Sequence, residues 1–172
     1  MNLRELTEEL RPNLAVIDDL YRDLEDRQMR WKPAADRWSL LEVLNHLLDE
    51  ERADFKQALQ NIIEDPVIDW PDISPWKWVT TREYNQRDPA ESREAFVAER
   101  NASLDWLSQQ PEPPLETIHQ GKHPFSSPMR TGDIIISWLA HDYFHIRQIT
   151  NLKWEFLMET SSPYSCGYAG DY

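Results

Sequence analysis

Apolar residues recur at three- and four-residue steps in four segments of the chain, the spacing that places them on one face of an α-helix. The first segment covers residues 3–24, and Pro12 inside it predicts either a kink or a later start of the helix. The second covers residues 40–63. Ser39, directly before it, and Glu42 in its first turn form an S-x-x-E capping box. These patterns predict two long helices in the first half of the chain.

The second half predicts two more helices. One begins at Asp88, an N-cap residue followed by Pro89 at the first helical position, and its apolar face continues to Leu107. The other covers residues about 131–158 and carries Asp133 in its first turn. The chain is therefore expected to be all-α.

Long connections separate these segments. Residues 64–88 and residues 111–130 each contain several prolines, and residues 160–172 form a tail without periodicity, expected to be irregular. Connections of this length favour a four-helix bundle with crossovers over an up-down-up-down bundle with tight loops. The 172 residues fit one domain, and no internal repeat divides them.

The composition narrows the range of partners. The formal net charge is −13 and no basic stripe is present, so neither a nucleic acid nor an anionic membrane surface is an expected partner. The single cysteine, Cys166, lies in the tail without basic neighbours and is not expected to act as a nucleophile. The first ten residues lack the apolar core of a signal peptide, and no apolar run is long enough to span a bilayer, so a cytoplasmic protein is expected.

Three histidines suggest a metal site. His141 and His145 are four residues apart on one predicted helix, so their rings share a face, although such a pair alone is as often ordinary packing. His46 lies among inward-facing leucines of another predicted helix. Each buried imidazole needs a partner, and one divalent ion bound by all three would satisfy them together.

Two stretches of this sequence resemble the DinB/YfiT-like family. The first comprises Trp31-Lys32-Pro33, Trp38-Ser39, Glu42, His46-Leu47 and Glu50, and the second runs from Trp138 to Ile149. The resemblance implies a four-helix bundle, often a homodimer, whose ligands to one divalent ion are His46, His141 and His145. Histidine ligands suit zinc, nickel or iron, so the ion is left open.

The family also implies a function. Its members include metalloenzymes and thiol S-transferases that use low-molecular-weight thiols such as bacillithiol or mycothiol. We therefore expect a metal-dependent enzyme that acts on a small-molecule substrate, as a thiol S-transferase or as a metal-assisted hydrolase. A non-catalytic bundle that binds a metal or a small ligand is the alternative. A metalloprotease is disfavoured because Asp142 stands where the H-E-x-x-H motif needs its glutamate.

Several polar residues are candidates for supporting roles. Glu50 lies one turn after His46 and could act as a catalytic base or an additional metal ligand, or could be a solvated carboxylate of the acidic run 49–51. Asp142 is expected to lie at the surface, the alternative being that it orients an imidazole from a neighbouring helix. Gln148 is expected to line the face of His145. Arg100 either pairs with a carboxylate or extends to the rim.

The remaining candidates are an aromatic residue and two histidines. Trp138 is expected in the pocket wall or in the core, one turn before His141. His119 and His123 fall in a predicted connection and are expected at the surface.

Overall fold

The computed structural model describes residues 1–70, 73–123 and 128–170. Residues 71–72, 124–127 and 171–172, which belong to the two predicted connections and to the tail, lie outside the described residues. The helices are α1 (Leu3–Tyr21), α2 (Asp26–Arg30), α3 (Leu40–Ala53), α4 (Phe55–Glu64), α5 (Pro75–Thr81), α6 (Pro89–Gln109) and α7 (Thr131–Thr160), with 3-10 turns η1 (Tyr84–Gln86) and η2 (Gly167–Ala169). No strand occurs within these ranges, apart from an isolated bridge between Ile118 and Arg130.

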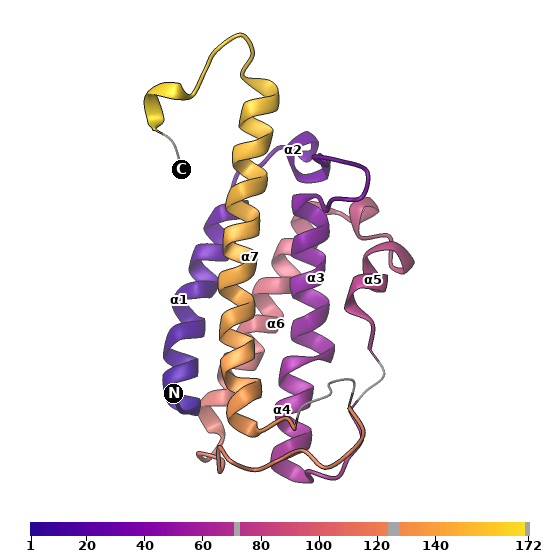
Figure 1. Ribbon diagram of the computed structural model, residues 1–172, viewed down its shortest axis with the longest axis vertical. Coiled ribbons are helices and arrows are strands. Elements are labelled where there is room, and N and C mark those ends of the chain that lie inside the picture. Colours follow the sequence, from indigo (N-terminus) through magenta and orange to yellow (C-terminus); the bar gives the residue numbers. More distant parts are fainter. Residues whose placement is uncertain (71–72, 124–127, 171–172) are drawn as a thin grey trace.

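Four long rods form the bundle: α1, the pair α3 and α4, α6, and α7 (Figure 1). α1 and α7 run in one direction, whereas α3–α4 and α6 run in the other. The segment between α4 and α6 therefore crosses the length of the bundle, and it carries α5 and η1. The predicted four-helix bundle is confirmed, but only this one connection crosses its length, because α6 ends and α7 begins at the same end of the bundle.

The predicted helix starts are capped as expected. The hydroxyl of Ser39 accepts from the backbone N–H of Glu42, whose carboxylate accepts from Ser39 N, and the side chain of Asp88 accepts from Glu91 N. The first helix begins at Leu3, so the later start suggested by Pro12 is wrong; the exposed proline ring is accommodated on the solvent side.

The helix predicted over residues 40–63 is interrupted and forms two helices. The segment 40–63 breaks at Asp54, whose backbone dihedrals (φ −121°, ψ −94°) are not helical, so α3 ends and α4 begins there. Neither proline nor glycine marks the break, which is why the periodicity alone predicts a continuous helix. The break changes the direction of the chain one turn after Glu50.

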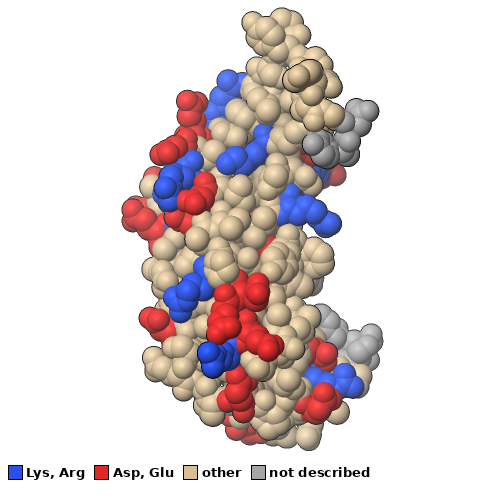
Figure 2. All heavy atoms as spheres, turned by 90° about the vertical axis from the view of Figure 1, so that its left-hand side faces the viewer, with Lys and Arg blue, Asp and Glu red and all other residues tan. Residues whose placement is uncertain are grey.

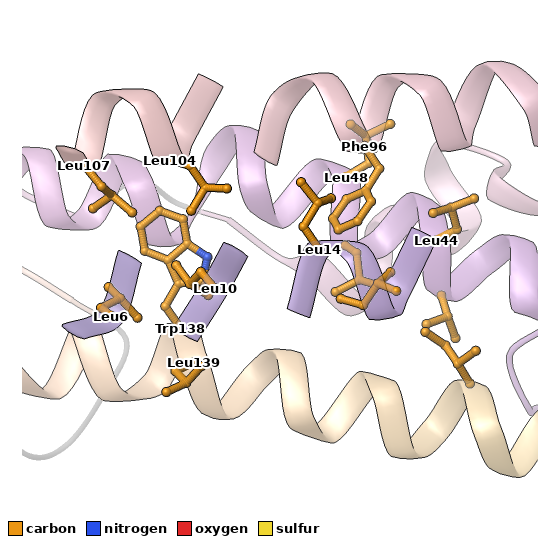
Figure 3. Close-up of a cluster of buried hydrophobic side chains, with 14 of the residues drawn as sticks. Leu6, Leu10, Leu14, Leu44, Leu48, Phe96, Leu104, Leu107, Trp138 and Leu139 are labelled. Atoms are coloured by element: carbon orange, nitrogen blue, oxygen red, sulfur yellow. The ribbon is translucent and has the colours of Figure 1, made fainter. Parts of the chain in front are cut away.

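The hydrophobic core runs along the bundle axis (Figure 3). Its side chains come from all four rods and include Leu10 of α1, Leu44 of α3, Phe96 of α6 and Trp138 of α7, each fully buried. Trp138 is a core residue that also stacks on Phe55, with ring centroids 6.0 Å apart. Burial of this apolar area is the main stabilising term of the fold.

The two predicted connections pack against each other beside α4. The backbone N–H of Trp70 donates to Lys122 O at 2.7 Å, and that of Gln120 donates to Pro66 O at 2.6 Å. A Cβ on Gly121 would lie 2.3 Å from Ile68 O, so only glycine allows this approach. The connections are thus structured where they are described.

The surface carries positively and negatively charged side chains side by side. On the face drawn in Figure 2, Lys and Arg side chains lie next to Asp and Glu side chains without forming a continuous basic area. None of the helices in the described part of the chain combines the length and the hydropathy that crossing a membrane requires. Cys166 is exposed.

Candidate metal centre

Three histidines meet between α3 and α7. The Nε2 atom of His141 lies 3.3 Å from Nε2 of His46 and 3.0 Å from Nε2 of His145, and one ring nitrogen from each residue falls within a common span of 4.8 Å. His46 and His145 are buried, and His141 is partly exposed. The structure therefore brings together the three side chains that the sequence singled out.

The cluster fits one transition-metal ion. Zinc–nitrogen bonds of about 2.0–2.1 Å in a tetrahedral site place two ligand nitrogens about 3.3 Å apart, close to the separations seen here. Burial lowers the pKa of His46 to about 3 and that of His141 to about 2, with the neighbouring histidines adding to both effects. Burial also lowers the pKa of His145. Neutral imidazoles offer lone pairs, the form that binds a metal.

A hydrogen bond orients one of the rings. His145 Nδ1 lies 2.8 Å from the side-chain oxygen of Gln148, an acceptor, so Nδ1 carries the proton and Nε2 faces the other histidines with its lone pair. The expectation that Gln148 lines this face is confirmed. His46 Nδ1 is buried without a hydrogen bond, and the nearest carboxylate oxygen, Oε1 of Glu50, is 3.8 Å away.

Glu50 is buried beside the histidines, so the alternative of a solvated carboxylate is wrong. Burial raises its pKa to about 9, and Asp54 and Asp49 add to the shift. The carboxyl groups of Glu50 and Asp54 influence each other's pKa, and burial raises the pKa of Asp54 as well. Asp54 was missed at the sequence level. Its i+4 spacing from Glu50 is the one signal that could have indicated it.

The acidic run 49–51 is buried throughout, and each carboxylate has its own surroundings. Asp49 accepts from the Tyr84 hydroxyl at 2.6 Å and from Arg82 at 2.7 Å, which attaches the crossing segment to α3. Glu51 accepts from Arg100 Nε at 2.8 Å. Successive residues on a helix point about 100° apart, so the three carboxylates of this run face three different directions around α3.

Asp142 is fully buried, so its expected surface position is wrong. Its carboxylate binds Arg100 through two hydrogen bonds and accepts from the side chain of Asn13 at 3.3 Å. Arg100 is 1% exposed and pairs with carboxylates, which confirms the first of its two interpretations. A buried network of four side chains thus joins α1, α3, α6 and α7 at the level of His141. It consists of Asn13, Glu51, Arg100 and Asp142.

His119 and His123 lie apart from the cluster of three. His119 is 3% exposed, which corrects its expected surface position, and its Nε2 lies 2.7 Å from Ile68 O. Its ring also contacts the rings of Trp70 and His123 at centroid distances of 5.4 and 5.6 Å. The burial of His119 comes from residues far away in sequence, and it stabilises the junction of the two connections.

A cavity of about 320 Å³ opens next to His141, where α4 meets α7. Phe55 and Phe144 contribute aromatic walls, and Asp54 contributes a carboxyl group. The centroid of the Phe55 ring lies 5.0 Å from that of His141. The candidate metal centre therefore has space beside it for a small molecule.

Comparisons with known proteins agree with this architecture. A model of the DinB superfamily matches residues 9–149. The structure is similar to that of YfiT from Bacillus subtilis, with a TM-score of 0.76 over 90% of this chain and 87% of that one, at 14% sequence identity. YfiT is described as a probable metal-dependent hydrolase with an unusual four-helix bundle topology. No curated protein matches the chain.

Proposed function

From the premise that the chain belongs to the DinB superfamily, we propose that it is a divalent-metal-dependent enzyme that hydrolyses a small molecule. The observation that carries the proposal is the convergence of three neutral imidazoles, from His46, His141 and His145, beside a cavity. The description of YfiT as a probable metal-dependent hydrolase supports the choice of reaction.

When bound to three imidazoles, a divalent zinc, nickel or iron ion keeps a coordination position for water or a thiol and lowers the pKa of that group towards neutrality. Glu50 lies beside His46, with its Oε1 atom 3.8 Å from His46 Nδ1, and burial raises the pKa of its carboxyl group in the metal-free chain. A carboxyl group whose pKa lies nearer to neutral pH than usual can accept and return protons during turnover. We assign Glu50 this proton-transfer role.

Elemental analysis of the purified protein tests the metal assignment. We expect about one metal ion per chain in the parent protein and a large loss in His141→Ala and His145→Ala. His123→Gln is the matched control, since His123 lies outside the cluster of three, and it should keep the metal content of the parent. Equal metal content in all four proteins would contradict the assignment.

The same preparations separate the possible activities. A hydrolase should cleave aryl esters or amides without an added thiol, and chelation should abolish that activity. A thiol S-transferase would need a low-molecular-weight thiol as second substrate, and a non-catalytic binding bundle would do neither. The homodimer that the family resemblance implies stays a prediction, and sedimentation velocity measures it directly.

A further inference from the structure

The cavity beside His141 has a chemical character of its own. Its walls are apolar and come from three parts of the chain: α4, the connections and α7. They consist of Phe55, Trp70, Met129, Ile134, Ala140 and Phe144. The polar groups that reach it are Asp54, Ser137 and His141. A volume of about 320 Å³ is at the lower end of the range that binds small molecules.

Aromatic rings dominate the part of the wall nearest the candidate metal centre. The Phe55 ring contacts the rings of both His141 and Trp138, and it is nearly parallel to that of Trp138, with an interplanar angle of 12°. Because Trp138 is fully buried in the core, this contact holds the Phe55 ring in place. A rigid aromatic wall favours a flat apolar group, since little side-chain freedom is lost when it binds.

The charges of the residues that line the cavity disfavour anionic ligands. No Lys or Arg belongs to its described lining, whereas Asp54 does. Apart from the candidate metal centre, the described lining offers an anionic group no counter-charge for the hydration it would lose, and such a group would face the carboxyl group of Asp54. The hydroxyl of Ser137 and the carboxyl of Asp54 can instead exchange hydrogen bonds with an uncharged amide or hydroxyl.

We infer that this cavity is the substrate-binding site, and that it selects an uncharged small molecule with an aromatic group, whose polar end lies between Asp54 and His141. That the bound molecule is a substrate rests on the proposed function. The binding preference itself is argued from the cavity lining and can be measured without any turnover.

Calorimetric titration with two probes tests the preference. The probe 2-naphthamide is flat and uncharged, whereas 2-naphthalenesulfonate presents the same ring with a negative charge. We expect the purified protein to bind the amide at least about tenfold more tightly than the sulfonate. Equal affinities, or no binding of the amide, would overturn the inference.

A pair of tryptophan substitutions locates the binding site. Ala140→Trp fills the apolar cavity from α7 and should weaken binding of 2-naphthamide at least about tenfold. The control is Ser108→Trp, which places the same ring at a second cavity of about 410 Å³, between α1 and the end of α6, whose lining includes Arg4, Glu8 and Glu112. It should leave the affinity unchanged. Equal affinity in the Ala140→Trp variant and the parent would place the probe elsewhere and overturn the inference.

The outcomes separate this inference from the proposed function. Binding that disappears in Ala140→Trp supports the cavity even if the protein contains no metal, in which case the proposed reaction is wrong. Metal content that depends on the histidines, together with failure to bind 2-naphthamide, would leave the metal centre in place and reject the substrate class. Comparison of the parent-protein affinities for the two probes requires no variant to fold.

Discussion

Arg100 binds the carboxylate of Asp142 at both ends of its guanidinium fork, with Nη1 2.7 Å from Oδ2 and Nη2 2.8 Å from Oδ1. Both side chains are fully enclosed by the bundle. The third N–H direction is occupied by Glu51, 2.8 Å from Nε. The pair fixes the rotation of α7 relative to α6, and therefore the direction in which His141 and His145 point.

Loss of this pairing should be costly. Arg100→Met leaves the carboxylates of Asp142 and Glu51 buried without their cation, so we expect the free energy of unfolding to fall by about 3–5 kcal/mol in urea titrations. Arg52→Met is the matched control, because Arg52 pairs with Glu99 at 2.8 Å on the surface. That substitution should cost less than about 1 kcal/mol. Similar losses in the two variants would contradict the role assigned to burial.

Metal affinity should depend on the side chain that orients His145. Gln148→Leu removes the acceptor for His145 Nδ1–H, and we expect the metal to bind about 10–100-fold more weakly. Gln148→Glu keeps an acceptor and should restore most of the affinity. Competition with a chromophoric chelator measures both constants, and unchanged affinity in Gln148→Leu would show that the bond has no such role.

Glu50→Gln should separate binding from turnover. The amide keeps the size of the side chain but can neither give up nor take up the proton that the carboxyl group exchanges, so activity should fall about 10²–10⁴-fold while the metal content stays that of the parent. Elemental analysis and initial rates on the same sample give both quantities. Parallel loss of metal and activity would instead make Glu50 a ligand or a structural residue.

The contribution of His46 to the stability of the metal-free protein should fall on mild acidification. The pKa of His46 is about 3 in the folded chain and 6.5 as its ordinary value, so below pH 6.5 the unfolded chain takes up a proton that the folded chain does not. This residue alone should lower the free energy of unfolding by about 2 kcal/mol between pH 7 and pH 5. Denaturation in the presence of a chelator, at both pH values, measures the loss.

His46→Gln is the control for the pH effect and should lose about 2 kcal/mol less than the parent over the same interval. Glu50 contributes with the opposite sign, because a raised pKa favours the folded state at lower pH, but it does so in both proteins. The difference between parent and variant therefore isolates the histidine. Equal losses would mean that His46 is protonated in the folded chain near pH 5.

Helix type and ligand spacing could be predicted because both depend on local periodicity. Ser39 and Asp88 mark helix starts through their own side chains, and the four-residue step from His141 to His145 sets their common face. Asp142 could not be placed in this way. Its sequence neighbours do not reveal that α7 packs against α1 on that side, where Arg100 of α6 supplies the counter-charge.

Two other features, the burial of His119 and the helix break at Asp54, were also not predicted. His119 is buried because Ile68, 51 positions earlier, supplies its acceptor. The break at Asp54 lies in a sequence with good helical periodicity and without a proline or glycine nearby. Propensity cannot anticipate either feature.

His46 precedes His141 by 95 positions, whereas His141 and His145 share one helix. A shared ion would therefore act as a cross-link between α3 and α7 and close a long loop of chain, which the unfolded polypeptide forms at an entropic cost. Neither helix could then leave the bundle before a coordination bond breaks. The ion would thus lengthen the lifetime of the folded chain against proteases, in addition to shifting its equilibrium.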